Sequence, residues 1–151
     1  MLSEKFNKRV IMLEKCIVMI SAINTEIEFL LKPSSEIITY LASRKDLAEL
    51  KFISDCNKNI LDGADVRSAW QDSVRKEENV INLKKNDIVI LSSFGEMFGS
   101  TGCEGQCANC KLYVEKLQSS LNDARQARDK YSKLFSLTGL LTGLYLIIFF
   151  L

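Results

Sequence analysis

The sequence predicts an all-α protein, a helical domain followed by a C-terminal transmembrane helix. One proline and seven glycines stand among 151 residues, so little interrupts long helices. Residues 134–151 carry no charge, and their aliphatic hydroxyls are Ser136, Thr138 and Thr142. As a helix this segment reaches roughly 27 Å, close to the roughly 30 Å hydrocarbon thickness of a bilayer. We therefore expect a helical domain over residues 1–133 and a membrane span over residues 134–151.

The main alternative is that the C-terminal segment is a buried core helix. A core helix is usually shorter and has one polar side, whereas this segment is apolar all round. Basic residues outnumber acidic ones just before it: Arg125, Arg128, Lys130 and Lys133 against Asp123 and Asp129. The positive-inside rule then predicts a cytoplasmic domain. The opening residues lack the basic start and cleavage site of a secretory signal.

Composition excludes several function classes. The chain is 47% apolar and 26% charged, which suits one modest core and is too short for a (β/α)8 barrel. Twenty Lys plus Arg against nineteen Asp plus Glu give a net charge of +1, unlike a nucleic-acid-binding protein. Histidine is absent, which removes the commonest general base and metal ligand. We expect neither an enzyme nor a cofactor.

The first helix is predicted over residues 6–32. Its apolar seam follows three- and four-residue spacing, and further apolar residues widen it: Val10, Leu13, Ile17, Ile20, Ile27 and Leu31, with Ile11, Met12, Met19, Ile23 and Leu30. Pro33 should end this helix. Ser34 or Ser35 is expected to cap a second helix that runs to about Ser43.

Three further helices are predicted before residue 100. One spans residues 46–61 and ends at the Asp62-Gly63 turn, and the next begins at Asp65 as its cap. In that helix Trp70 shares an apolar face with Val66, Ala69 and Val74, so we read it as a core anchor. Residues 83–98 contain a run that could form a strand, but the apolar spacing favours a helix.

The last helix is predicted to run from the domain into the membrane. Residues 106–138 hold neither glycine nor proline, and the inward stripe comprises Cys110, Val114, Leu117, Leu121 and Ala124. Together with the span this makes one rod of up to about 65 to 70 Å. Within the span, Gly139 and Gly143 have the small-residue spacing that lets two membrane helices approach closely.

Three clustered cysteines form the sharpest local pattern: Cys103, Cys107 and Cys110. Their spacing occurs in iron–sulfur radical enzymes, but those enzymes use a barrel larger than this chain and usually carry an aromatic residue where Asn109 stands. Zinc is a second possibility, with Cys16 or Cys56 as the fourth ligand. Reduced free thiols are the base case in the cytosol. A metal-binding or redox-sensing membrane protein therefore stays open as the alternative function.

Several blocks, in this order, carry a family resemblance: Thr25-Glu26-Ile27, Lys32-Pro33, Ala69-Trp70, Phe94-Gly95-Glu96-Met97-Phe98-Gly99, and Leu137-Thr138-Gly139-Leu140-Leu141-Thr142-Gly143-Leu144. The chain resembles the stage III sporulation protein AB family over nearly its whole length. The resemblance implies an antiparallel helical bundle similar to the cytoplasmic domains of type II secretion F proteins. It also implies a membrane protein of the secretion-like channel between mother cell and forespore, without catalysis of its own.

The resemblance further implies a mother-cell membrane location and partners. These are the ATPase-like stage III sporulation protein AA and other stage III channel proteins.

Two features depart from the family. Its members usually begin with a membrane helix, so we expect either a truncated start or a single span here. The cysteine triplet has no family counterpart, so a metal role would belong to this protein alone.

Overall fold

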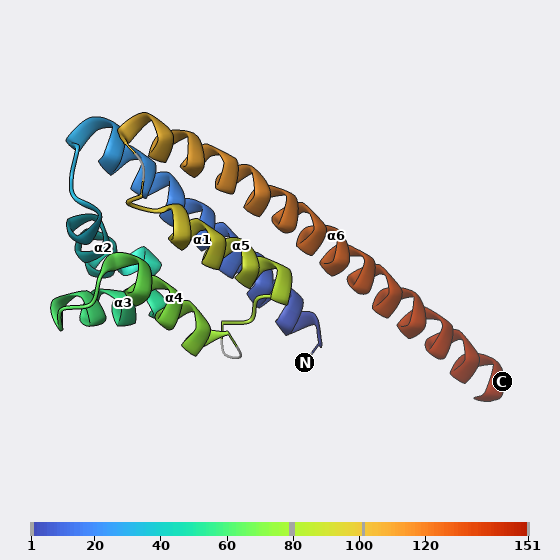
Figure 1. Ribbon diagram of the computed structural model, residues 1–151. Coiled ribbons are helices and arrows are strands. Elements are labelled where there is room, and N and C mark those ends of the chain that lie inside the picture. Colours follow the sequence, from blue (N-terminus) through green and yellow to red (C-terminus); the bar gives the residue numbers. More distant parts are fainter. Residues whose placement is uncertain (1, 79–80, 101, 151) are drawn as a thin grey trace.

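The computed structural model describes residues 2–78, 81–100 and 102–150, and every regular element in them is helical. In chain order these elements are α1 (Leu2–Leu30), α2 (Ser34–Ser43), the 3-10 turn η1 (Lys45–Leu47), α3 (Lys51–Leu61), α4 (Val66–Glu77), α5 (Lys85–Met97) and α6 (Cys103–Phe150), as labelled in Figure 1. The prediction of an all-α bundle with a long apolar C-terminal helix is confirmed.

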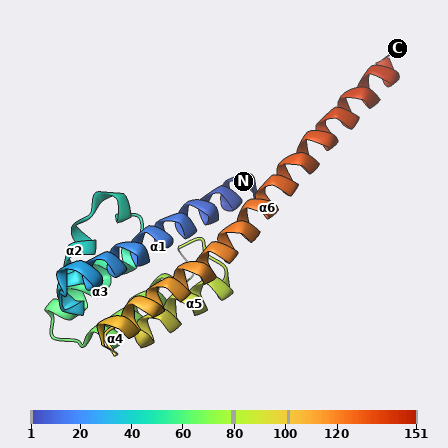
Figure 2. The same ribbon diagram turned by 90° about the horizontal axis from the view of Figure 1, so that it is seen from above.

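The two longest helices, α1 and α6, lie side by side and run in opposite directions (Figures 1 and 2). Helix α6 starts beside the C-terminal end of α1, where the Cys103 thiol donates to the Ile27 carbonyl at 3.6 Å. It then passes the start of α1 and continues alone, away from every other helix. The rest of the chain packs along the first part of this pair.

Helices α3, α4 and α5 fold back on one another in turn. Across α3 and α4, Lys76 pairs with Asp55 at 2.9 Å. Across α4 and α5, the Gln71 amide donates to the Ser92 carbonyl at 2.6 Å, and Arg67 donates to the Glu96 carbonyl at 3.1 Å. Residue numbers rise on α4 as they fall on α5, so these helices are antiparallel.

One core joins the helices. Its largest fully buried side chains come from every helix of the first two thirds of the chain: Leu13, Met19, Ile20, Ile23, Ile37, Ile38, Leu41, Leu47, Leu50, Phe52, Trp70 and Phe94. Helix α6 adds Cys110, Leu117, Leu121 and Ala124 from the predicted stripe, whereas Val114 of that stripe is half-buried. The stripe also includes Tyr113 and Ser120, which the apolar pattern did not predict.

The predicted seam of α1 is wrong at three positions. Ile11 is 42% exposed, Leu30 56% and Leu31 72%, whereas the rest of the seam and its flanking residues are buried or half-buried. Helix α6 begins level with Ile27, so nothing in the described chain covers the last residues of α1. The helix ends two residues before the predicted Lys32, because Leu31 adopts a left-handed backbone with φ of 50°.

Two local predictions need correction. Neither Ser34 nor Ser35 caps α2, because the helix already begins at Ser34 with Pro33 before it and no side-chain cap. The predicted helix 46–61 is divided into η1 and α3. The Asp65 cap is confirmed, since its carboxylate accepts a hydrogen bond from the Ser68 backbone N–H at 3.1 Å. A hydrogen bond from the Ser68 hydroxyl, together with this backbone hydrogen bond, lowers the pKa of Asp65.

Candidate functional site: the helix that leaves the bundle

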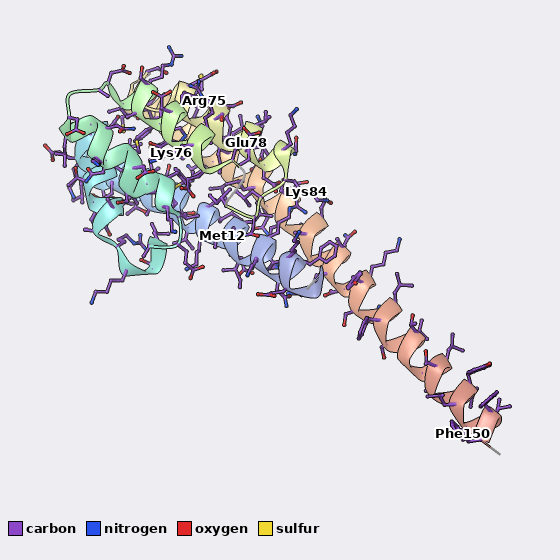
Figure 3. All side chains as sticks on the ribbon, turned by 90° about the horizontal axis from the view of Figure 1, so that it is seen from below. Met12, Arg75, Lys76, Glu78, Lys84 and Phe150 are labelled. Atoms are coloured by element: carbon purple, nitrogen blue, oxygen red, sulfur yellow. The ribbon has the colours of Figure 1, made fainter. Side chains whose placement is uncertain are left out.

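Helix α6 has two parts with opposite surroundings. Up to Ala124 a stripe of its side chains is buried against α1 and α5. Beyond Tyr131 every described residue is exposed, with Leu134 54% and Phe150 82% exposed. Figure 3 labels Phe150 at the free end of the rod. The 48 residues of the helix make one continuous rod of about 72 Å, slightly longer than the predicted 65 to 70 Å.

The free part of α6 is too apolar to remain in water. It is long and apolar enough to cross a membrane, and none of its apolar window is buried. Each Leu, Ile or Phe left in water forgoes roughly 1.5 to 3 kcal/mol of burial free energy. The alternative of a buried core helix is therefore wrong for this chain. A lipid bilayer or another apolar surface must cover the segment.

The two glycines of the span lie one helical turn apart and face open space. A Cβ added to Gly139 or Gly143 would meet no atom within 4 Å. Their i, i+4 spacing places both on one face, so a second helix could approach the backbone closely there. Helix association through Gly139 and Gly143 stays a prediction.

A buried ion pair joins the start of α5 to α1 and α6. Arg9 donates from Nε and Nη2 to the two carboxylate oxygens of Asp87, at 2.8 and 3.0 Å. The Lys84 backbone N–H donates to Asp87 at 2.9 Å, and the Ser120 hydroxyl of α6 also hydrogen-bonds to it. Burial alone would raise the pKa of Asp87, but these donors hold it below its ordinary value.

This ion pair was not predicted from the sequence, although the spacing of Arg9 indicates that its side chain is buried. Arg9 precedes Leu13, Cys16 and Ile20 by four, seven and eleven residues, which places it on their buried stripe. A charge at such a position needs a buried partner. The identity of that partner, 78 residues away, could not be read from local spacing.

Trp70 is the core anchor that its apolar face predicted. It is fully buried, and its indole N–H donates to the Leu91 carbonyl of α5 at 2.9 Å. Its ring packs edge-on against Phe52 and tilted against Phe94 and Phe98, at centroid distances of 5.4 to 6.1 Å. Tyr113 of α6 joins the cluster by an edge contact with Phe94 at 5.5 Å.

The two glycines of the block Phe94-Gly95-Glu96-Met97-Phe98-Gly99 are required for different structural reasons. A Cβ on Gly95 would lie 2.5 Å from the Cγ and Nε1 atoms of Trp70, and closer still to Cδ1. Gly95 is therefore the gap into which the indole fits. Gly99 has a φ of 80°, a left-handed conformation that favours glycine after the end of α5. The block is explained by packing and by chain reversal.

The cysteine triplet runs along one face of α6 from the surface into the core, and the thiols of Cys103 and Cys107 are in hydrogen-bond contact. Cys103 is exposed, Cys107 is half-buried and Cys110 is buried in the core. Burial raises the pKa of Cys110 to about 12, so its thiol stays protonated and is a poor metal ligand. Burial and the neighbouring Cys103 raise the pKa of Cys107 as well.

The candidate fourth ligands belong to other parts of the bundle. Cys16 and Cys56 are fully buried in α1 and α3, and burial raises the pKa of Cys56 to about 12. Among the described residues no group of three metal-ligating side chains comes together. The geometry gives the zinc and iron–sulfur hypotheses no support.

Comparisons with known proteins agree on one family. The family model of stage III sporulation protein AB matches residues 1–151. Stage III sporulation protein AB of Bacillus subtilis (strain 168) is 35% identical over 82 residues, which are 54% of this chain and about half (48%) of that protein. A solved structure of stage III sporulation protein AB superposes with a TM-score of 0.67 at 25% identity, covering 82% of this chain and 98% of that one. The chain belongs to the stage III sporulation protein AB family.

Proposed function

We propose that this sporulation protein is a membrane-anchored adaptor that holds an ATPase-like partner beside the mother-cell membrane. In this proposal α6 crosses the membrane with its apolar part and presents the bundle on the cytoplasmic side. The partner is stage III sporulation protein AA, and the assembly is the secretion-like channel between mother cell and forespore. The protein contributes position and a mechanical connection, without catalysis.

The observation that carries the proposal is the continuity of α6. One helix supplies both a face of the bundle core and the exposed apolar segment. Residues 106–138 contain no glycine or proline, so the helix lacks the usual causes of a kink at the exit from the bundle. The helix therefore couples the orientation and any movement of the bundle directly to the membrane segment.

An exposed apolar tip supports the binding of a protein partner. Phe29, Leu30 and Leu31 are 73%, 56% and 72% exposed at the end of α1, where α6 begins. We call these three residues the α1 tip. Adjacent exposed apolar side chains of this size favour a protein interface. Charged residues elsewhere on the bundle surface, such as Glu14, Glu28, Arg67 and Arg75, would steer the encounter.

Deletion of residues 134–151 tests the adaptor role. The truncated domain should fold, stay in the soluble fraction and bind the ATPase-like partner, because the bundle core lies entirely before residue 125. Spores should nevertheless fail to form, because the partner is no longer recruited to the membrane. Normal sporulation by the truncated protein would contradict the proposal.

The α1 tip supplies the complementary variant. Replacing Phe29 and Leu31 by serine should leave folding and membrane attachment intact, because both side chains are exposed, and should weaken partner binding. The matched control replaces Leu61, which is 73% exposed at the end of α3, by serine. Membrane-attached protein that binds its partner equally well in all three forms would exclude the tip as the contact surface.

A further inference from the structure

A small pocket lies beside the point where α6 leaves the bundle. It has a volume of about 340 Å³ and is formed by the start of α1 and the loop before α5: Lys5, Phe6, Arg9, Asn82, Leu83 and Lys84. Figure 3 labels Lys84 close to this exit point. The walls combine cationic ends with the apolar side chains of Phe6 and Leu83.

The pocket has an excess of positive charge. Lys5 and Lys84 are exposed, and neither forms an ion pair with a described residue. Arg9 also lines the pocket, and its partner Asp87 is fully enclosed and already occupied by Nε and Nη2 of that arginine. The third guanidinium nitrogen, Nη1, is buried without a hydrogen-bond partner among the described residues. The side chain of Arg9 is only 9% exposed, so this unmet donor is held in place.

A buried guanidinium nitrogen without a partner and two exposed lysines, all in the lining of one pocket, match a phosphate group. Because Nε and Nη2 of Arg9 are held by Asp87, Nη1 is the guanidinium nitrogen left to donate to a phosphate oxygen, and the two lysines add positive charge. A buried donor without a partner costs free energy that an incoming acceptor recovers. The apolar side chains would contact the carbon part of the ligand rather than a bare ion.

The level of the pocket along α6 identifies the source of the phosphate. Phe6 contacts Tyr131 with ring centroids 5.4 Å apart, and Tyr131 lies three residues before Leu134. Three residues of helix rise by about 4.5 Å, whereas the headgroup layer is roughly 5 to 7 Å deep on each side of a bilayer. Aromatic rings and lysines such as Lys130 and Lys133 are typical of that layer.

We propose that this pocket binds the headgroup of an anionic phospholipid. The lipid phosphate lies among Lys5, Arg9 and Lys84, and its glycerol part lies against Phe6 and Leu83. Such a contact ties the start of α1 to the membrane surface and restricts rotation of the bundle about α6. The proposal rests on the membrane insertion of α6 in the proposed function.

Binding is measured on the full chain in an uncharged detergent, with dioctanoyl phosphatidylglycerol as the probe. The double variant Lys5→Gln with Lys84→Gln should bind this lipid at least tenfold more weakly, because each cation near an anionic headgroup strengthens binding several-fold. Arginine at both positions should restore the affinity. The matched control, Lys51→Gln with Lys58→Gln on the exposed side of α3, loses the same charge and should bind normally.

Three results would overturn the proposal. The first is equal affinity for dioctanoyl phosphatidylcholine, which carries no net charge. The second is inorganic phosphate binding as tightly as the lipid, which would indicate a site for a free anion. The third is an equal loss in the control variant, which would indicate diffuse surface charge. Extraction of the protein from membranes by alkaline carbonate would instead refute membrane insertion, so the two failures are distinguishable.

Discussion

Replacing Gly95 by alanine should disrupt the core of the bundle, although alanine favours a helix. The added Cβ would overlap the indole of Trp70, which is fully buried and cannot move towards solvent. Overpacking costs about 1 to 3 kcal/mol. Displacing the indole also breaks its hydrogen bond to the Leu91 carbonyl, at about 1 to 3 kcal/mol for a buried donor left unpaired. The higher helix propensity of alanine offsets about 1 kcal/mol of this loss.

The net loss is therefore about 1 to 5 kcal/mol in the free energy of unfolding. At about 2 to 4 °C per kcal/mol for a chain of this size, the loss lowers the melting temperature by roughly 2 to 20 °C. Thermal unfolding of the full chain in detergent, followed by circular dichroism, measures the change. Gly139→Ala is the matched control, because it makes the same substitution in a helix with no atom within 4 Å of the new Cβ.

A double-mutant cycle tests the physical reason. Trp70→Phe gives up the indole hydrogen bond and part of the ring, which leaves room for a methyl group at residue 95. Gly95→Ala combined with Trp70→Phe should therefore cost clearly less than the two single variants added together. Additive costs, or a Gly95→Ala variant that melts with the wild type, would refute the packing argument.

Two further predictions concern buried charge and free thiols. Asp87→Asn should cost about 3 to 5 kcal/mol at neutral pH, because it leaves the Arg9 guanidinium buried without its counter-ion. The pKa of Asp87 is lowered in the folded protein, so the greater free energy of unfolding of the wild type should persist down to about pH 4. It should disappear as the pH falls through the pKa of Asp87 in the folded protein. Urea unfolding at several pH values measures the change. Replacing the cysteine triplet by serine should leave a folded protein that supports spore formation. A metal that co-purifies with the wild-type protein, together with loss of folding in the variant, would contradict this.

Local pattern was enough to predict most of the fold. Helical spacing correctly assigned residues 83–98 to a helix, and Pro33 and Asp65 marked two helix boundaries within a few residues. The apolar character of residues 134–151 predicted a segment without a place in the core. These features depend on neighbours within about one or two helical turns, which is the range that a single sequence reports.

Contacts between distant helices could not be predicted in the same way. Arg9 and Asp87 meet across 78 residues, and the indole of Trp70 needs the missing Cβ of Gly95 on another helix. Leu30 and Leu31 of the α1 tip were assigned to the core because periodicity records which residues share a face, and not where the covering helix begins. In this bundle α6 begins level with Ile27, so the apolar face of α1 extends beyond its cover.

The same geometry fixes how far the α1 tip stands from the membrane in the proposed arrangement. Cys103 is level with the end of α1, and 31 residues of unbroken helix separate it from Leu134. At 1.5 Å per residue this is roughly 46 Å. A partner on the tip would therefore be held at a set height, and a lipid bound in the pocket near Phe6 would restrict how the bundle turns. A short flexible linker in place of residues 128–133 would remove both constraints while keeping partner binding and anchorage, which separates recruitment from rigid positioning.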